Sequence, residues 1–575
     1  MKTIAQYIRP HYGIIAWTMV LKLVAAMMDL LIPSFLARII DGALPSGDRR
    51  QVFFWGGMMA VCAVVSMVTN LSANRTAGRT SSNITRVLRR DLFEKISHLS
   101  AQQLDKLTVP SAVSRLTSDT YNLNHLFNRT QRLGVRAPIL LVGGLAITLA
   151  MDAALTLVLL LTLPFITLIV YTVTKKSVPL YMRQQGVLDR MVRTVQENVT
   201  GVRVIKALSK EDYEKERFDK VNLELADTER KAASVMAATN PSTGFVLNIG
   251  LTMVVVAGAW LVNAGRSSTG NIIAFLNYFT IILYAMLGIT RIFVMFSRGA
   301  ASALRVEEVL ALEEDLIVLP AGEKEDTPWH IEFRDVSFSY NKSVDNLSHI
   351  NFALKRGETL GILGATGSGK TTLVYLLLRF YDVDSGQVLL DGEDIRTIPR
   401  ERLHRMFGVA FQNDFIMGDS LRRNIDYFRG IPEDRLLEAA RDAQADAFIA
   451  ELPDGLDHVA AMRGNDLSGG QKQRILISRA LAGQPDVLIL DDSSSALDYR
   501  TDAALRKALS ERYAGVTKVI VAQRISSIKG ADHILVLDDG QAVGYGTHDE
   551  LMRSCEAYRS IGETQMGLEG GGADE

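Results

Sequence analysis

The sequence predicts a multi-domain fold, with an all-α six-helix transmembrane domain followed by an α/β P-loop domain. Six apolar stretches of about 20 residues, the length that crosses a bilayer, lie in the N-terminal half. A Gly-x-x-x-x-Gly-Lys-Thr motif begins at Gly364, and strand and helix patterns alternate around it. A chain of 575 residues is also too long for one hydrophobic core, so at least two domains are expected.

The composition combines an apolar half with a charged, soluble half. Hydrophobic residues make up 48% of the chain, yet 63 basic and 64 acidic residues leave a net charge of −1. This balance gives no reason to expect nucleic acid as a partner. Only Cys62 and Cys555 are present, one in each half, so we expect neither a disulfide framework nor a thiolate metal site. The first apolar run is too long for a signal peptide.

The membrane domain is predicted to begin with a short amphipathic segment on the membrane surface, at 1–12. A tight turn around Asp152 is expected to join the third span to the fourth. The predicted spans are 14–36, 53–73, 137–156, 157–174, 243–264 and 271–292.

The segments between the spans differ in length and charge. The long ones, 74–136 and 175–242, are rich in Arg and Lys and have helical periodicity, whereas the short loops on the opposite side carry few basic residues. The positive-inside rule then places both termini, both long segments and the α/β domain in the cytoplasm. The sequence therefore predicts a multi-pass protein of the cell membrane, the inner membrane of a bacterium.

Four regions follow from these patterns. The sixth span continues as a helical pattern, so the transmembrane domain is predicted to occupy 1–314. A linker with Pro320 and Gly322 occupies 315–328. The α/β domain is expected at 329–565, and the Gly-rich, acidic tail at 566–575 is predicted to be disordered.

The glycine-rich motif is predicted to bind the phosphates of a nucleotide. A buried strand precedes it and a helix follows, so backbone N–H groups and the helix dipole point at the β- and γ-phosphates. Lys370 is expected to reach these phosphates, and the Thr371 hydroxyl to bind Mg²⁺. The expected phosphate-binding residues are Gly364, Thr366, Gly367, Ser368, Gly369, Lys370, Thr371 and Thr372.

Further motifs form a set with this loop. They are Leu467-Ser468-Gly469-Gly470-Gln471, the strand Val487–Asp491, Ser495-Ala496-Leu497-Asp498, Gln412 within Ala410-Phe411-Gln412-Asn413, and Tyr340. With six spans in front of them, the chain resembles a half-transporter of the ATP-binding cassette (ABC) exporter family along nearly its whole length. The resemblance implies an ATP hydrolase coupled to transport, with ATP and Mg²⁺ as cofactors.

The motifs have physical roles as well as family roles. Asp491 ends an apolar strand, where its carboxylate can hold Mg²⁺ beside Thr371, and the resemblance adds Gln412 to the metal and catalytic residues. Tyr340 matches the residue that stacks on adenine, although its position alone would also suit an ordinary strand aromatic. The resemblance also assigns Asp498 to nucleotide contact.

The signature segment Ser468, Gly469, Gly470 and Gln471 opens a helix and so presents N–H groups to an anion. In the family, this anion is the γ-phosphate on the phosphate loop of the other subunit. One chain has one phosphate loop and one signature, so a dimer is implied.

Two positions depart from the family pattern. Asp492 stands where the catalytic glutamate is expected, and Gln523 replaces the switch histidine. The shorter carboxylate retreats by about 1.5 Å, and a misplacement near 1 Å can cost ~10²-fold in rate. Glutamine can bond a γ-phosphate but cannot carry the protons of an imidazole. The alternative is that both substitutions arose by drift in a site that is still active. The loss of both the glutamate and the histidine instead favours the degenerate-site half of a heterodimeric exporter.

The sequence thus predicts an exporter of a drug (multidrug export), a lipid or a peptide from the cytoplasm or inner leaflet. The expected partners are the lipid bilayer, this substrate and a second, different half-transporter with the catalytic glutamate and histidine; no nucleic acid is expected. A homodimeric exporter with slow hydrolysis, and a nucleotide-gated switch or channel that does not pump, remain alternatives.

Two features of the membrane domain allow further expectations. Lys22 and Asp29 are seven residues apart on one face of the first span, and Asp29 lies about 22 Å in at 1.5 Å per residue. They either line a substrate cavity or form a buried structural pair. By resemblance, short coupling helices are expected around Pro110–Thr120 and Glu197–Lys206.

Overall fold

The computed structural model describes residues 2–313, 315–320, 322, 324–412, 415–493 and 495–570. The chain forms two compact units. Met1–Ser97 and Pro110–Leu312 make up the first, and His98–Val109 and Glu313–Glu575 the second.

The described residues of the first unit form helices and connecting turns, with no strand among them. Six of its helical segments are long and apolar enough to cross a membrane, which confirms the predicted six spans. The helices are α1 (Lys2–Ile8), α2 (Tyr12–Arg38), α3 (Arg49–Ser97), α5 (Val109–Ser114), α6 (Thr120–Leu133), α7 (Arg136–Met151), α8 (Ala153–Thr200), α9 (Val202–Ala207), α10 (Glu211–Ala237), α11 (Thr239–Asn263) and α12 (Thr269–Leu310), with short turns at Arg9–His11, Ile39–Ala43 and Arg115–Asp119.

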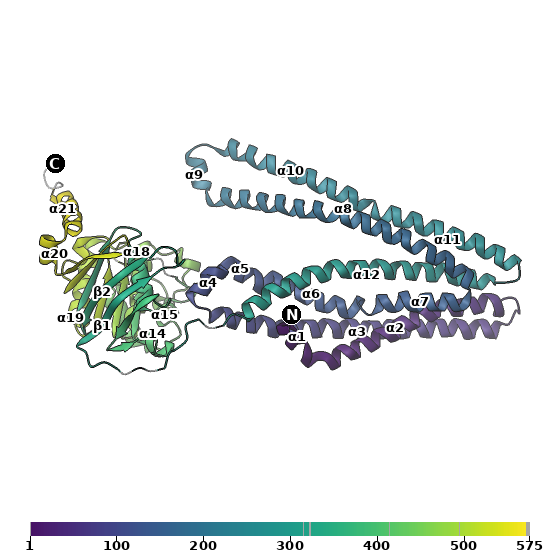
Figure 1. The fold of residues 1–575 in the computed structure, drawn as a ribbon, viewed down its shortest axis with the longest axis horizontal. Helices are drawn as coiled ribbons and strands as arrows, with labels where there is room; N and C mark the ends of the chain where they lie inside the picture. Colours follow the sequence, from purple (N-terminus) through teal and green to yellow (C-terminus); the bar gives the residue numbers. More distant parts are fainter. Residues whose placement is uncertain are drawn as a thin grey trace. The chain divides into compact units, whose positions relative to one another are not determined.

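The long segments between the spans are continuations of the membrane helices, as their periodicity predicts. In Figure 1, α8 runs beside α10 and α11, and α9 joins α8 to α10 at one end of this pair. Helix α3 packs along α2 in the same unit. Since α3 has 49 residues and α8 has 48, each is more than twice the length that a bilayer requires.

The third and fourth spans meet at Asp152, as expected, but their bounds differ from the prediction. Helix α7 ends at Met151 and α8 begins at Ala153. The Asp152 carboxylate accepts hydrogen bonds from the backbone N–H groups of Ala154 (2.9 Å) and Leu155 (3.2 Å). The predicted division at 156/157 is therefore wrong. The apolar run is continuous there, so the cap, and not hydropathy, marks the start of the helix.

The second unit is built on one sheet with the strand order β5-β4-β1-β2-β10-β9-β3-β8-β7-β6. Strands β6, β7, β8, β3 and β9 are parallel, and β7 is buried along its whole length, as expected for a strand covered on both faces. The strands are β1 (Trp329–Phe338), β2 (Leu347–Lys355), β3 (Thr359–Gly364), β4 (Ser385–Leu390), β5 (Glu393–Asp394), β6 (Phe407–Ala410), β7 (Val487–Asp491), β8 (Thr517–Val521), β9 (His533–Asp538) and β10 (Gln541–Gly546).

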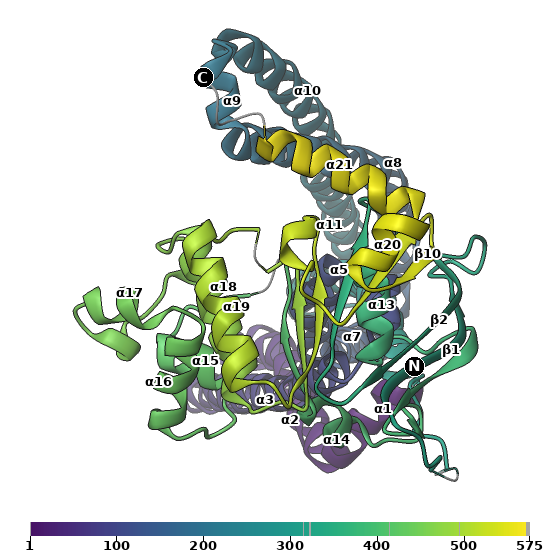
Figure 2. The ribbon, with the colours of Figure 1, turned by 90° about the vertical axis from the view of Figure 1, so that its left-hand side faces the viewer.

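Helices surround this sheet, and α15, α16 and α17 group together next to α18 (Figure 2). The helices are α4 (Ala101–Leu107), α13 (Lys370–Leu377), α14 (Arg400–Arg405), α15 (Leu421–Asp426), α16 (Glu433–Asp442), α17 (Asp446–Glu451), α18 (Gly469–Ala482), α19 (Tyr499–Arg512), α20 (His548–Ser554) and α21 (Glu556–Gly570), with short turns at Gly455–Asp457, Met462–Gly464 and Ile525–Ser527. The α/β character of this unit is as predicted.

Two segments of the second unit differ from expectation. Helix α21 runs to Gly570, so the first half of the tail predicted as disordered is helical, while 571–575 lie outside the described residues. The short helix α4 belongs to the second unit, whereas Pro110–Thr120 belongs to the first. The coupling role expected around Pro110–Thr120 stays a prediction, and α4 is a second candidate for it.

Candidate functional site

The phosphate loop lies between β3 and α13. Gly367 and Gly369 have φ of +88° and +100°, in the left-handed region that glycine adopts without strain. At Gly364, a Cβ atom would lie 2.3 Å from the backbone oxygen of Leu537, so the neighbouring strand leaves no room for a side chain. These glycines allow the chain to turn tightly from the strand into the helix.

Two polar groups of the loop, the Lys370 ammonium and the Ser368 hydroxyl, are candidates to bind phosphate. The Lys370 ammonium donates to the backbone oxygens of Gly364 (2.8 Å) and Ala365 (2.7 Å), folded back on its own loop. Burial lowers the pKa of Lys370. The Ser368 side chain is buried, and its Oγ has no partner among the described residues. A lysine that bonds to its own loop and a buried hydroxyl without a partner, together with the helix N-terminus, fit an anion of the size of a phosphate chain.

Two oxygen ligands suited to Mg²⁺ meet beside the loop. The Thr371 hydroxyl donates to the Asp491 carboxylate at 3.3 Å, and burial raises the pKa of Asp491. Among the described residues there is no cluster of three His, Cys, Asp or Glu side chains that could hold a metal. Mg²⁺ usually takes one or two protein oxygens and completes its shell with phosphates and water, so this pair fits such a role.

The carboxylate of Asp492 is held by two glutamines. The side-chain amides of Gln412 (2.9 Å) and Gln523 (2.8 Å) both donate to the same Oδ2 atom. Asp492 has a φ of +49°, and burial raises the pKa of its carboxyl. Two amide hydrogen bonds to one oxygen fix the orientation of the carboxylate, so Asp492 does not turn freely toward a water.

These groups line one pocket of about 310 Å³. It brings together most of the predicted phosphate-loop residues, both aspartates and both glutamines. Asn346 and Val521 also line it, and sequence reasoning missed them. The side chain of Asn346 accepts a hydrogen bond from the backbone of Tyr340 at 3.0 Å. The lining residues are Asn346, Thr366, Gly367, Gly369, Lys370, Thr371, Thr372, Gln412, Asp491, Asp492, Val521 and Gln523.

Tyr340 lies beside the pocket within an aromatic cluster. Its ring packs edge-on against Phe338 (4.9 Å between centroids) and Tyr381 (5.1 Å). The Tyr340 hydroxyl is 3.3 Å from the Thr372 hydroxyl, which is on α13. Burial raises the pKa of Tyr340, so the phenol stays neutral at physiological pH. The ring is thus held rigidly next to the helix that follows the phosphate loop.

The signature segment and Asp498 are not part of this pocket. Ser468 caps α18, with its Oγ accepting from the backbone of Gln471 (3.3 Å) and the Gln471 side chain accepting from the backbone of Ser468 (2.8 Å). Asp498 caps α19 by accepting from Thr501. Among the described residues, Ser468, Gly469, Gly470, Gln471 and Asp498 line no part of the pocket. The capping box uses the N–H groups of Ser468 and Gln471, so a contact of the signature with another molecule would depend on Gly469 and Gly470.

The membrane unit contains a second polar constellation. The Asp29 carboxylate forms an ion pair with Arg136 of α7 (2.7 Å) and accepts from Ser66 of α3 (2.6 Å). Lys22 instead bonds to Asn70 and to Asn74 (2.8 Å) on α3. Of the two alternatives for Lys22 and Asp29, the structural pair is contradicted, because Lys22 bonds to Asn70 and Asn74 whereas Asp29 bonds to Arg136 and Ser66.

Two protein families match the chain. Residues 15–286 match the ABC transporter transmembrane region, and residues 347–495 match the ABC transporter domain. The chain is 33% identical to an uncharacterized ABC transporter ATP-binding protein, YfiB, of Bacillus subtilis, over 99% of both chains. It is 32% identical to the uncharacterized ABC transporter ATP-binding protein Rv1273c of Mycobacterium tuberculosis, over 97% of both.

The name of a further relative states a substrate. The fatty acid ABC transporter ATP-binding/permease protein of Mycobacterium bovis is 33% identical over 82% of this chain and 75% of its own length. Among solved structures, a bacterial Atm1-family ABC exporter with ATP bound has a TM-score of 0.81 at 21% identity, covering 96% of this chain and 98% of that one. This likeness concerns the fold of the whole chain.

Proposed function

The chain belongs to the ABC transporter family, and from this premise we propose that it is the degenerate-site half of a heterodimeric exporter. A half-transporter has one membrane region and one ATP-hydrolysing domain, and ABC exporters work as dimers. The partner in this proposal is a different half-transporter, with a glutamate and a histidine where this chain has Asp492 and Gln523.

The observation that carries the proposal is the binding of Asp492 by two amides. A general base must accept a proton from the attacking water within hydrogen-bond reach. The aspartate is shorter than glutamate, and its Oδ2 is already bonded to Gln412 and Gln523. The shorter side chain and its fixed orientation both hold the carboxylate away from the attacking water, so the site of this chain binds ATP and turns it over slowly.

The residues of the pocket fit ATP with Mg²⁺. Lys370 would exchange its bonds to Gly364 and Ala365 for the β- and γ-phosphates, and Ser368 would gain an acceptor. Thr371 and Asp491, with Gln412 nearby, would hold Mg²⁺, which neutralises phosphate charge. Tyr340 would stack on the adenine, and the partner's signature would close the pocket.

The second, productive site would combine the phosphate loop of the partner with the signature of this chain. Ser468 and Gly470 begin α18, so the N-terminal N–H groups and dipole of the helix would face the γ-phosphate there. The capping box at Ser468 and Gln471 fixes this helix start. This chain therefore contributes to hydrolysis mainly through its signature.

Short helices would link nucleotide state to the membrane helices. Within the second unit, two hydrogen bonds hold α4 in place. Asp105 accepts from the Tyr381 hydroxyl (2.5 Å), and Ser100 donates to Asp315 (2.7 Å). We propose that α4 is the coupling helix that contacts the nucleotide-binding domain of its own chain. The aromatic contact of Tyr381 with Tyr340 brings this helix close to the adenine side of the site.

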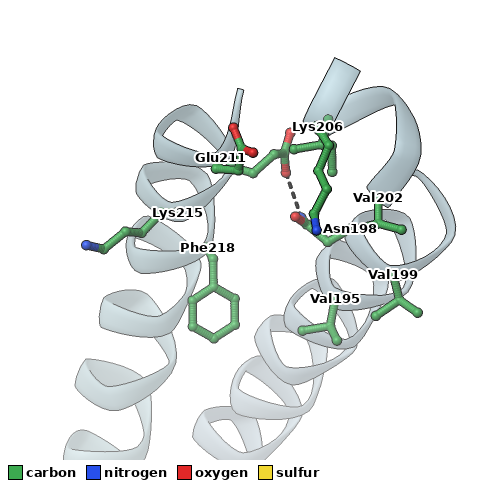
Figure 3. A pocket seen from close by; sticks show the side chains of 10 residues that line it. Val195, Asn198, Val199, Val202, Lys206, Glu211, Lys215 and Phe218 are labelled. Atoms are coloured by element: carbon green, nitrogen blue, oxygen red, sulfur yellow. Dashed lines mark hydrogen bonds between the residues drawn. The ribbon is translucent and has the colours of Figure 1, made fainter. Parts of the chain in front are cut away.

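The second coupling element is the tip formed by α8, α9 and α10. A pocket of about 370 Å³ opens there between apolar side chains, including Val195, Val199 and Phe218, with Lys206 and Glu211 at its rim (Figure 3). Asn198 donates to Glu214 across it at 2.7 Å. Val199 is 70% exposed, and we propose that the nucleotide-binding domain of the partner covers this apolar tip.

In this proposal the protein lies in the cytoplasmic membrane of a bacterium, with both termini and the nucleotide-binding domain inside. It moves a substrate out of the cytoplasm or inner leaflet. Among drugs, lipids and peptides, the relative named as a fatty acid transporter favours a lipid.

Isolation of the tagged chain from its own host tests the pairing. Native mass spectrometry in nanodiscs should find one copy of this chain with one copy of a different half-transporter. Two copies of this chain with robust ATP turnover would instead establish the homodimer. Substrate movement in vesicles with a non-hydrolysable nucleotide would establish a nucleotide-gated channel.

A further inference from the structure

A cluster of charged side chains in the membrane unit carries more positive than negative charge. Lys22 of α2 and Arg132 of α6 are joined through Asn74 of α3, and Arg136 of α7 lies within electrostatic range of Lys22. Among the described residues, the one carboxylate that forms an ion pair in this cluster is Asp29, and its partner is Arg136. Three positive groups and one negative group leave a net charge of +2.

Two of the cations share one neutral acceptor. Lys22 Nζ (2.8 Å) and Arg132 Nε (2.9 Å) both donate to Oδ1 of Asn74. Lys22 is only 2% exposed. An amide oxygen satisfies hydrogen-bond donors but does not neutralise charge, and buried charges are costly unless an opposite charge compensates them. No carboxylate among the described residues forms a hydrogen bond with either of these two cations.

The third cation is only partly compensated. Arg136 forms an ion pair with Asp29, but its Nε is buried and has no acceptor among the described residues. A guanidinium presents its donors in a planar fork that suits two oxygens of one carboxylate or phosphate. Arg136 therefore offers a further donor to the anion that Lys22 and Arg132 attract.

The cluster lies at the level of the membrane. Lys22 is eight residues beyond residue 14, where the first span is predicted to begin, which is about 12 Å at 1.5 Å per residue. This depth is in the inner half of a hydrocarbon core of about 30 Å. Met19, Leu23 and Met27 of α2 are exposed at four-residue spacing, so an apolar surface runs beside Lys22 on the same helix.

We propose that Lys22, Arg132 and Arg136 bind the anionic head group of an amphiphilic lipid, while its acyl chain lies along the apolar face of α2. This inference rests on the proposed exporter function and names its substrate class. Asn70 and Asn74 hold the cations in place, and Asp29 orients Arg136. A fatty acid carboxylate and a phospholipid phosphate share the required chemistry.

Binding to the full-length chain tests the proposal without ATP or a partner. The chain is placed in phosphatidylcholine nanodiscs, and binding is measured for a nitroxide-labelled fatty acid, its methyl ester and labelled phosphatidic acid. The free acid or phosphatidic acid should bind about tenfold or more tightly than the uncharged ester, the gain expected for charge-assisted hydrogen bonds. The tighter of the two anions identifies the head group. Equal binding of all three overturns the proposal.

Variants assign the preference to the cluster. Arg132 is exposed, so Arg132→Gln should fold, and it should remove most of the preference for the anion. Lys22→Gln should do the same. Arg183→Gln, which removes an exposed charge from α8, is the matched control and should keep the preference. An equal loss in Arg183→Gln, or no loss in Arg132→Gln, overturns the assignment. If the chain keeps its anion preference but no second half-transporter co-purifies, the heterodimer fails and this inference stands.

Discussion

Gln523 and Asp492 are joined by a hydrogen bond of 2.8 Å, in which the amide of the glutamine donates to a carboxylate oxygen. The same oxygen accepts from Gln412 at 2.9 Å. A histidine at position 523 could exchange a proton with its surroundings, whereas an amide cannot. The two departures from the family pattern are therefore bonded to each other, with Gln523 as the donor and Asp492 as the acceptor.

The first prediction is that this site retains intact ATP. When turnover of the heterodimer is quenched, we expect about one unhydrolysed ATP per complex, because ~10²-fold rate losses follow from a misplaced base. The double variant Asp492→Glu/Gln523→His should shorten this retention at least tenfold. Rapid filtration and nucleotide analysis measure it. If the wild-type complex retains no ATP, the site is not degenerate.

The predicted site positions that lie together in the structure come from short runs of consecutive residues. The phosphate loop, the strand ending at Asp491 and the pair Asp492 and Gln523 meet in one pocket because strand, turn and helix follow directly in the chain or in neighbouring parallel strands. The six spans were predictable for a similar reason, since a bilayer imposes a fixed length on each apolar run.

The remaining features depend on contacts between distant segments. Arg136 reaches Asp29 from 107 residues away, and Asp105 reaches Tyr381 from 276 residues away. Neither pair leaves a periodic pattern in the sequence. Asn346 was missed because its loop position carries no motif, although it bonds to the backbone of Tyr340.

The second prediction concerns the anchoring of α4. Tyr381→Phe removes the phenol that donates to Asp105, a bond to a charged group worth about 1.5–3 kcal/mol. Amide hydrogen exchange in 98–109 should therefore become about tenfold faster or more, while ATP binding persists. Exchange mass spectrometry on the full chain measures this. Tyr545→Phe, which removes a phenol bonded to a backbone oxygen of β2, is the control and should leave 98–109 unchanged.

The third prediction concerns the ion pair in the membrane unit. Asp29→Asn leaves Arg136 without its carboxylate, and removing one partner of a buried pair costs up to about 3–5 kcal/mol. Both side chains are partly exposed, so the loss should be below that limit but should lower the Tm of the purified protein. Asp219→Asn, at an exposed position of α10, should not. The double variant Asp29→Asn/Arg136→Gln should recover part of the loss; no recovery would show that the pair is not the cause.

The last prediction separates the two nucleotide sites of the heterodimer. The productive site takes only the signature from this chain. Gly470→Asp therefore acts on that site, and it places a negative charge where N–H groups should face a γ-phosphate. Loss of such a donor costs ~10²- to 10³-fold, so most of the steady-state ATP hydrolysis should disappear. Gly470→Ala adds a Cβ that lies 3.1 Å from the backbone oxygen of Ala496, and it controls for crowding alone.

The comparison variants in this chain's own site should behave differently. Asp492→Ala removes a residue that takes little part in turnover, so phosphate release should fall by less than half. The hydrolysis rate of Lys370→Ala should lie between the rates of Asp492→Ala and Gly470→Asp, because ATP bound by this chain helps to hold the dimer together. If Asp492→Ala reduced hydrolysis as strongly as Gly470→Asp, Asp492 would be a working general base, and the pairing of this chain with a catalytically stronger half would lose its main support.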